Sequence, residues 1–440
     1  MSTKRNHPKR GKLSGQNALT RRNFLWGAGV AGAAAGLNGL LPGRALAQTG
    51  PAIKIGYVSP QTGPLAPFGA ADNFVIGELK TILAAGVKIA GKTHPVTVIV
   101  SDSQSDPNRA AEVAANLILK EEVQLMLVAS TPETVNPAAD QCEINGIPCV
   151  SSVVPWQPYF FGRGGNPAKG FDWTYHFFWG LEDIIAVFLN MWNSLPTNKV
   201  VGALYPNDGD GNAWGDPQRG FPPALIKAGY QIVDPGRYQN LTDDYSSYIS
   251  AFKKADVQIV TGVPIPPDFT TFWNQAAQQG FRPKIATVGK ALLFPDSVQA
   301  LGTKGVGLSS EIWWTPHHPF RSSLTGQTAR QLATEYTRQT KKQWTQPLGF
   351  VHTLFEIAID ALKRTPRVGD HAALRDAVKS TRLDTIVGSV SWAKGPVPNV
   401  AKTPLVGGQW VKGTDFPYDL TITNNELAPN IPAGGKLRPL

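Results

Sequence analysis

Short runs of aliphatic and β-branched residues alternate with amphipathic segments along most of the chain after residue 52. Buried parallel strands appear in a sequence as short apolar runs, and the helices between them carry an apolar residue every three or four positions. The pattern therefore predicts an α/β fold, with parallel sheets covered by helices on both faces. The first predicted strands are 53–58, 96–100, 125–128 and 147–150, and the helices between them are 68–85, 108–121 and 133–144.

The alternation stops once, inside an aromatic segment, and then resumes. Ten of the 24 residues in 156–179 are aromatic, and a glycine-rich loop at 162–165 interrupts them. A block of helices follows the second alternating unit before strands return, so we expect the chain to cross between two lobes several times. Ligands bind such sheets at the carboxyl ends of the strands, which predicts a cleft between the lobes. The later predicted strands are 199–204, 230–233, 257–261, 285–288, 385–392 and 405–411, and the helices are 183–194, 217–228, 245–254, 268–280, 328–341, 350–363 and 371–380.

The positive charge of the chain is concentrated at its N-terminus. Eight of the 42 Lys and Arg residues lie in residues 1–47, which contain no Asp or Glu, and the remaining 34 nearly balance 32 acidic residues. A protein that binds polyanions needs a basic face on its folded part. The charge distribution therefore argues against nucleic acid as a partner.

The same N-terminal region resembles a twin-arginine secretion signal. A Thr-Arg-Arg-Asn-Phe-Leu motif at 20–25 precedes an apolar run at 26–41, and Ala-Leu-Ala at 45–47 has the form of a signal-peptidase site. The apolar run contains five glycines and is too short to span a membrane. We therefore expect cleavage after Ala47 and a mature protein located in the periplasm.

The only two cysteines, Cys142 and Cys149, lie seven residues apart. Two cysteines cannot provide the four ligands of a structural zinc site or an iron-sulfur cluster. A helix that ends near Ile144, a turn at 145–146 and a returning strand would bring the two side chains together. In an oxidising compartment we expect a structural disulfide between them, with two buried free thiols as the alternative.

Motifs for catalysis and for cofactor binding are missing from the sequence. The chain has no phosphate-binding P-loop, no G-x-S-x-G, no H-E-x-x-H and no C-x-x-C. Residues 208–212 imitate the start of a calcium loop, but Ala213 and Arg219 occupy the positions that require Gly and Glu. The pair at 317–318 is His-His without an identifiable third ligand. We therefore expect no cofactor and no metal ion.

Five short motifs, spread over residues 52–395, are moderately specific when they are taken together. They are IKIGYVSPQTGPLAPFG at 53–69, SDSQSDP at 101–107, NPAA at 136–139, GIPCVS at 146–151 and LDTIVGSVSW at 383–392. In these motifs the chain resembles the leucine/isoleucine/valine-binding family of periplasmic proteins, which are type I solute receptors of ABC importers. The resemblance implies a monomeric clamp of two Rossmann-like lobes, joined by three crossovers, with a ligand cleft between them. It also implies a small-molecule solute as ligand, and ABC permease and ATPase subunits in the inner membrane as partners.

The clamp architecture assigns the chain to a signal peptide and two discontinuous lobes. Residues 1–47 form the signal peptide in this assignment. The first lobe consists of 52–178 with 315–384, and the second lobe consists of 179–314 with 385–440.

The resemblance further implies ligand contacts in loops that follow the strands. The aromatic residue after Gly-Pro in the first loop corresponds to Phe68, and the aromatic lid of the second lobe corresponds to Trp214. The hydroxyl-rich loop that binds the ligand carboxylate in the family corresponds to Ser130, Thr131 and Thr134. These hydroxyl residues could also serve only as helix caps, and the two aromatic residues could belong to ordinary packing.

The resemblance also bears on three further positions. The loop after the fourth strand provides Ser151, and the aromatic segment provides Trp156, which either contacts ligand or packs in the core. Amino-acid binders have a carboxylate near position 290 for the ligand ammonium, but this sequence has Lys290. A lysine in the cleft would favour an anionic or carbonyl group on the ligand, whereas a lysine in a solvated loop would contribute nothing. We therefore expect a carboxylate or amide compound, with a planar or apolar body that can stack.

Two other functions remain open at this level. The same clamp could be a ligand-sensing subunit that docks on a membrane receptor. An exported hydrolase could use a carboxylate in the cleft, such as Asp102 or Glu311, but no pair of nucleophile and base stands out. We expect a protein that is not an enzyme.

Overall fold

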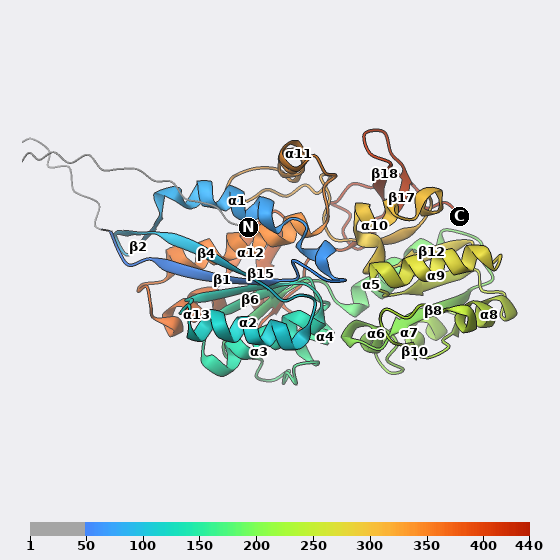
Figure 1. Ribbon diagram of the computed structural model, residues 1–440, viewed down its shortest axis with the longest axis horizontal. Coiled ribbons are helices and arrows are strands. Elements are labelled where there is room, and N and C mark those ends of the chain that lie inside the picture. The colour runs from blue at the N-terminus through green and yellow to red at the C-terminus, as the bar shows by residue number, and fades with distance from the viewer. Residues whose placement is uncertain (1–48) are drawn as a thin grey trace, which may run out of the picture. The chain divides into compact units, whose positions relative to one another are not determined.

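Two β-sheets, each covered by helices, organise residues 49–440, which the computed structural model describes (Figure 1). The predicted export signal and its cleavage position after Ala47 lie outside the described residues. Contacts group Ala47–Leu440 into one unit, so both sheets belong to the same body. Within the described part, no helix has the length and apolar character that a membrane crossing requires.

The sheet of the first lobe has six strands, all paired in parallel, in the order β16-β7-β6-β5-β1-β4. Its strands are β1 Ile53–Ser59, β4 Val96–Asp102, β5 Leu125–Ala129, β6 Cys149–Ser152, β7 Thr174–Phe177 and β16 Val400–Ala401. Its helices are α1 Asp72–Ile82, α2 Pro107–Leu119, α3 Pro132–Asn145, α4 Trp156–Phe160, α11 Ala329–Thr340, α12 Pro347–Arg364 and α13 His371–Lys379. This lobe also contains the 3-10 turns η1 Ala66–Gly69, η2 Leu83–Ala85 and η5 Trp392–Lys394. Two hairpins complete it: β2 Val87–Ile89 pairs with β3 Lys92–His94, and β14 Arg382–Thr385 pairs with β15 Gly388–Ser391.

The sheet of the second lobe has eight strands, in the order β10-β8-β11-β12-β13-β17-β18, with β9 beside β8. Its strands are β8 Val200–Pro206, β9 Gln231–Val233, β10 Arg237–Tyr238, β11 Ile259–Gly262, β12 Ile285–Val288, β13 Ser309–Ile312, β17 Val406–Lys412 and β18 Tyr418–Asn424, the last two antiparallel. Its helices and 3-10 turns are α5 Leu181–Asn193, α6 Gly209–Trp214, α7 Phe221–Lys227, α8 Ser246–Lys254, α9 Pro266–Gln278, η3 Ala291–Leu293, α10 Pro295–Gln299 and η4 Gly302–Gly305.

Both faces of the first sheet are buried, as its apolar runs predicted. In β5, Leu125 and Leu127 belong to one hydrophobic cluster, whereas Met126 and Val128 belong to another. Successive side chains of a strand point to opposite faces, so the two clusters lie on opposite sides of the sheet. The burial of every residue of β5 explains why the strand reads as a continuous apolar run rather than an alternating one.

The chain crosses between the sheets three times, between β7 and α5, between β13 and α11, and between β16 and β17. Figure 1 shows the consequence, because the orange helices α12 and α13 lie beside the blue and teal first part of the chain. The last crossing comes after Ala401, since β16 pairs with β7 of the first sheet. The boundary predicted at residue 384 is therefore too early. A strand of two residues has no hydrophobic periodicity from which it could be recognised.

The two cysteines meet as the turn geometry predicted, but they are not bonded to each other. Cys142 of α3 and Cys149 at the start of β6 are both free and fully buried. The helix ends at Gly146, which has the left-handed conformation that such a turn requires. Burial and the neighbouring Cys149 raise the pKa of the Cys142 thiol. The expected disulfide is thus replaced by a buried pair of thiols, whose apolar surroundings disfavour the thiolate that disulfide exchange needs.

Candidate ligand-binding cleft between the lobes

The loops at the carboxyl ends of the strands of both sheets meet at one cavity of about 20 Å³. Residues that follow β1, β5, β6 and β7 form the first-lobe side, and residues of β13 or following β8, β11 and β12 form the second-lobe side. Such a volume holds about one water molecule. The lobes are in contact around it, and the rings of Phe68 and Phe294 meet edge to face with centroids 4.9 Å apart. A solute of several heavy atoms therefore requires the lobes or their side chains to move apart.

Three hydroxyl groups on the first-lobe side have no hydrogen-bond partner within residues 49–440. They belong to Ser130, Thr131 and Thr134, which are at most 1% exposed. Thr131 is the N-cap residue of α3, yet its side chain does not cap the helix. Buried hydroxyls normally find a partner, and a helix N-terminus favours an anion. The arrangement suits a ligand carboxylate better than the cap-only interpretation, because no cap hydrogen bond is made.

The backbone is strained where three loops enter this cavity region. Ser130 after β5 has φ 151°, Val153 after β6 has φ 73°, and Lys290 after β12 has φ 55°. Non-glycine residues in such conformations cost about 1–3 kcal/mol each and concentrate at functional sites. The strain supports the assignment of this place as the binding site from an observation that does not depend on side-chain contacts.

Lys290 carries a buried positive charge that two carboxylates of the second lobe neutralise. Its Nζ lies 2.8 Å from Asp210 Oδ2 and 3.2 Å from Asp208 Oδ2, and the three side chains are 3–5% exposed. Burial alone would lower the pKa of Lys290, but Asp208, Asp210 and Glu133 raise it above its ordinary value. The solvated-loop alternative for Lys290 is therefore wrong. The position of Lys290 agrees with the other alternative, a lysine in the cleft. Its positive charge, however, is already balanced by carboxylates of the protein.

Two acidic side chains give the second-lobe side an excess of hydrogen-bond acceptors. Asp210 Oδ1 is buried without a partner among the described residues, and burial raises the pKa of this carboxyl although Lys290 opposes the effect. Glu311 of β13 lines the cavity, accepts a hydrogen bond of 2.9 Å from Ser310 Oγ, and has its pKa raised to about 7 by burial. This side therefore favours a ligand group that donates hydrogen bonds.

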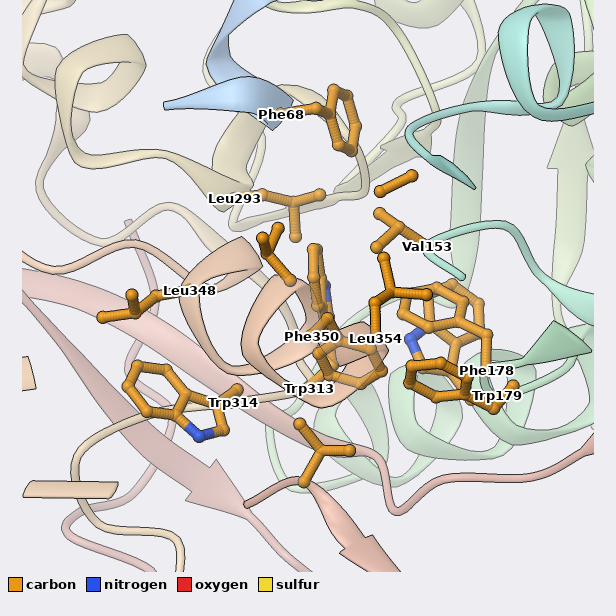
Figure 2. Packing of buried hydrophobic residues seen from close by; sticks show 14 of the residues in the cluster. Phe68, Val153, Phe178, Trp179, Leu293, Trp313, Trp314, Leu348, Phe350 and Leu354 are labelled. Atoms are coloured by element: carbon orange, nitrogen blue, oxygen red, sulfur yellow. The ribbon is translucent and has the colours of Figure 1, made fainter. Parts of the chain in front are cut away.

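Aromatic side chains from both lobes line the cavity. Figure 2 shows Phe68, Phe178, Trp179 and Trp313 among the buried hydrophobic residues. Trp214 stacks on Phe221 with ring centroids 4.8 Å apart, which holds the predicted lid residue in place. The indole N–H groups of Trp214, Trp179 and Trp313 are buried and make no hydrogen bond in the described part of the chain. Phe68 lines the cavity as the resemblance implied. The walls can thus stack on an apolar or planar body and donate to its polar edges.

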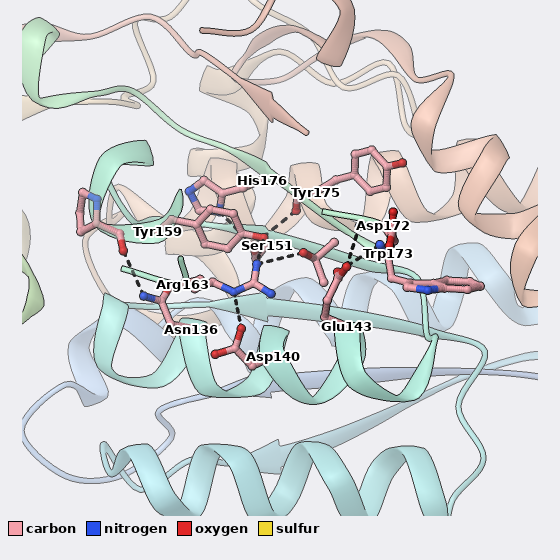
Figure 3. A network of polar contacts seen from close by, with 12 residues as sticks. Asn136, Asp140, Glu143, Ser151, Tyr159, Arg163, Asp172, Trp173, Tyr175 and His176 are labelled. Carbon is pink, nitrogen blue, oxygen red and sulfur yellow. Dashed lines mark hydrogen bonds and ion pairs between the residues drawn. The ribbon is translucent and has the colours of Figure 1, made fainter. Parts of the chain in front are cut away.

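Four of the eight predicted contact residues do not line the cavity: Ser130 and Thr134, which flank the lining residue Thr131, and Ser151 and Trp156. Ser151 lies inside the first lobe, with its Oγ 2.9 Å from His176 Nδ1 (Figure 3). Trp156 donates from Nε1 to Glu182 at 3.1 Å, and Lys402 binds the same carboxylate at 2.8 Å. Glu182 and Lys402 lie on two of the three crossing segments, so Trp156 helps to join these segments instead of lining the cleft. Sequence reasoning placed Ser151 and Trp156 by proximity to a motif and had no information on side-chain direction.

Asp102 and Glu311, the two carboxylates considered for a hydrolase, have different roles in the structure. Asp102 accepts hydrogen bonds from Thr62 Oγ1 at 2.6 Å and from the backbone N–H of Gln61 at 2.8 Å, and so holds the loop after β1. It does not line the cavity that contains Glu311. Within residues 49–440, no group of three His, Cys, Asp or Glu side chains is arranged to hold a metal ion.

A hydrogen bond away from the crossing segments also connects the two lobes, and neither of its residues lines the cavity. Glu133 of α3 accepts from the backbone N–H of Gly209, the first residue of α6, at 2.8 Å. The Arg219 guanidinium of the second lobe also lies 5.3 Å from the ring centre of Phe161 in the first lobe. These contacts form only when the lobes are together, so they stabilise the closed form alone.

Replacing Glu133 by alanine is expected to weaken ligand binding about 3- to 10-fold, because a bond specific to the closed form is lost. Isothermal titration would measure the affinity, and small-angle scattering would measure the fraction of closed protein. Glu143→Ala is the matched control, since Glu143 on the same helix accepts from two backbone N–H groups of its own lobe, at 2.6 and 3.1 Å. Equal losses of affinity in both variants would contradict a latch between the lobes.

Comparison with known proteins gives a consistent family. A family model described as periplasmic binding protein matches residues 52–414. The structure is similar to that of a leucine-binding protein, LivK, from Thermotoga maritima, with a TM-score of 0.67 at 18% identity over 85% of this chain and 99% of that chain.

Two similar structures contain different ligands. The branched-chain amino acid transporter substrate-binding protein LivJ from Streptococcus pneumoniae, in complex with isoleucine, has a TM-score of 0.66 at 17% identity, over 84% of this chain and 99% of that chain. A solute-binding protein of an ABC transporter from Rhodopseudomonas palustris, in complex with 3,4-dihydroxybenzoic acid, has a TM-score of 0.66 at 16% identity, over 85% of this chain and 98% of that chain. At these identities the similarity shows a common fold.

Proposed function

Because the chain belongs to the periplasmic binding protein family, we propose that it captures one small solute between its lobes and delivers it to the permease of an ABC importer. The protein acts in the periplasm as a monomer after cleavage behind Ala47, and its partners are the permease and ATPase subunits in the inner membrane. Ligand binding favours the closed form, which presents both lobes to the permease. The alternative of a sensing subunit would use the same closure.

The solute carries a carboxylate and, some distance away, a group that donates hydrogen bonds. One observation carries this proposal: Thr131, whose buried hydroxyl is unpaired in the described part of the chain, lines a cavity whose other side holds the free oxygen of Asp210 and the carboxyl of Glu311. A second anionic group is disfavoured, because Lys290 is already matched by two aspartates. The sequence-based preference for an anion at Lys290 is therefore replaced by a preference for an ammonium, amide or hydroxyl donor.

The ligands of the two similar complexes fit this description. Isoleucine carries a carboxylate and an ammonium, and 3,4-dihydroxybenzoic acid carries a carboxylate and two phenolic donors. Both have an apolar or planar body of the kind that the tryptophan walls can contact. We therefore expect a ligand from one of these two chemical classes.

Thermal unfolding against a small panel tests the proposal. The panel contains isoleucine and 3,4-dihydroxybenzoate, with benzoate as a carboxylate lacking donors and isobutylamine as a donor lacking a carboxylate. A ligand at a hundred times its dissociation constant stabilises the protein by about 2.7 kcal/mol. We expect shifts only with compounds that carry both groups. A shift with isobutylamine alone would contradict the carboxylate contact, and a larger shift with benzoate than with the hydroxylated acid would contradict the donor contact.

Affinity for an amino acid is expected to rise about tenfold between about pH 6 and pH 8. Burial raises the pKa of Glu311 to about 7, and an ammonium group binds the ionised carboxyl better than the neutral one. Binding therefore releases a proton, so affinity increases with pH in this window. By the same raised pKa, the free folded protein loses stability as pH rises from about 4 through 7. Titrations should show an affinity that rises with pH in the native protein and is independent of pH in Glu311→Gln. If the rise is retained in Glu311→Gln, another group causes it.

A further inference from the structure

A second cavity, of about 500 Å³, lies on the first lobe and shares no lining residue with the cleft. We call it the lateral pocket. Strand β7 provides Tyr175, the turn η5 provides Trp392, and helix α13 provides Arg375 and Lys379. The volume is typical of sites for small organic molecules. Nothing in the capture of a solute between the lobes uses this pocket.

The lining of the lateral pocket has an excess of positive charge. Lys169, Arg375 and Lys379 contribute three cations, and Asp172 contributes the only carboxylate of the lining. Lys169 Nζ lies 3.6 Å from Asp172 Oδ2, and Arg375 binds Asp376 at 2.8 Å outside the lining. Lys379 has no ion-pair partner among residues 49–440. A ligand with a negative charge would therefore complete the electrostatics of the pocket.

Two fixed aromatic rings give the pocket an apolar wall. The rings of Tyr175 and Trp392 lie 5.4 Å apart, and Trp392 Nε1 donates to the carbonyl of Val378 at 2.7 Å, which sets the orientation of the indole. The Arg375 guanidinium lies 4.8 Å from the ring centre of Trp173, so it is also held in place. Figure 3 shows Tyr175 and Trp173 at the edge of the polar network of this lobe.

The hydroxyl of Tyr175 is a donor without a partner in the described part of the chain. Its side chain is 3% exposed, and burial raises the pKa of this phenol, so that it stays protonated. The hydroxyl oxygen is not among the buried atoms that lack a partner, so it is accessible from the pocket that Tyr175 lines. A carboxylate that meets both Lys379 and this hydroxyl would be bound by a charge and by a directed hydrogen bond.

We propose that the lateral pocket is a second binding site, which takes a planar organic anion such as an aromatic carboxylate. The ring lies against Tyr175 and Trp392, and the carboxylate faces Lys169, Lys379 and the Tyr175 hydroxyl. This site is independent of the proposed function of the cleft.

The test uses 4-fluorobenzoate as probe, observed by fluorine NMR with the whole protein. We expect saturable binding, weakened about tenfold in Lys379→Gln and in Tyr175→Phe, and unchanged in Lys120→Gln, an exposed lysine of the same lobe outside the pocket. The neutral analogue 4-fluorobenzamide should bind more weakly, and acetate should not displace the probe.

Variants of the cleft separate this site from the other one. Because 4-fluorobenzoate carries a carboxylate, it could also enter the cleft, and Thr131→Val would then reduce that binding. Probe binding that is lost in Thr131→Val and retained in Lys379→Gln would overturn the lateral site and leave the proposed function standing. Binding that acetate displaces completely would also overturn it, because simple counter-ion attraction would then explain the signal. Retention in Thr131→Val with loss in both pocket variants supports the second site.

Discussion

Replacing Lys290 by methionine is expected to lower the free energy of unfolding by about 3–5 kcal/mol at neutral pH, the largest effect of any single change considered for this protein. In the native structure, Lys290 Nζ lies 3.2 Å from Asp208 and 2.8 Å from Asp210. The substitution leaves these two buried carboxylates without their cation. An unpaired buried charge costs far more than the net contribution of the intact pair. Denaturant unfolding followed by circular dichroism measures the loss.

The pH dependence of this loss identifies its cause. The raised pKa of Lys290 keeps its ammonium charged throughout the range below about pH 10, so Lys290 itself causes no change in the stability of the native protein there. In Lys290→Met the loss should shrink toward pH 5, because burial already raises the pKa of Asp210, which can become neutral by taking up a proton. Adding Asp208→Asn and Asp210→Asn to Lys290→Met should recover most of the stability.

Lys227→Met serves as the matched control, since Lys227 is an exposed lysine of the same lobe at the end of α7. Its replacement should change stability by less than about 0.5 kcal/mol. A loss in Lys290→Met that is independent of pH, or that the two asparagine substitutions do not relieve, would contradict the account of an uncompensated pair.

Thr131→Val is expected to have the opposite profile, with affinity reduced about 10- to 100-fold and stability unchanged or slightly higher. Valine has nearly the shape of threonine and lacks only the hydroxyl. That hydroxyl is buried, does not cap α3 and has no hydrogen-bond partner within the described chain, so its removal leaves nothing unpaired. A ligand carboxylate would lose a charge-assisted hydrogen bond. Titration with the panel compound that gives the largest thermal shift measures the affinity.

Thr345→Val provides the comparison for this substitution. Thr345 is also buried with an unpartnered hydroxyl, but it does not line the cavity. Its replacement should leave affinity unchanged. If Thr131→Val binds the ligand as tightly as the native protein, the hydroxyl loop does not hold the carboxylate and the orientation of the solute in the cleft must be reversed.

The hydroxyl loop and the aromatic contacts were accessible from the sequence because they belong to local motifs. Thr131 precedes Pro132 and Glu133 at a helix start, and Phe68 follows a Gly-Pro turn. Short-range patterns of this kind constrain the backbone of the residues that carry them. The structure places Phe68, Thr131, Trp214 and Lys290 around one cavity, and their contact with a ligand stays a prediction.

The acidic side of the cleft could not be predicted in the same way. Lys290 and Asp208 are separated by 82 residues in the sequence. They meet because Asp208 follows β8 and Lys290 follows β12, and these two strands flank β11 in the sheet. Residues 208–212 imitate the start of a calcium loop in the sequence, but in the structure Asp208 caps α6 by accepting from the backbone N–H of Gly211 at 2.7 Å. The sequence offered Glu311 only as a candidate carboxylate of a hydrolase, because its strand β13 reads Ser-Ser-Glu-Ile and has no apolar run that would predict a strand.

By itself, the sequence determined the alternation of strands and helices, the two-lobed α/β architecture and the places where loops could meet a ligand, but it did not reveal the strands β7, β13, β16 and β18. These features follow from hydrophobic periodicity and turn residues, which act over a few neighbouring positions. Only the tertiary structure decided that Lys290 is neutralised, that Trp156 joins crossing segments, that Cys142 and Cys149 are buried thiols, and that Glu133 connects the lobes. Charge state and side-chain direction depend on burial and on partners distant in the chain, and these exist only after the sheets have formed and the lobes have met.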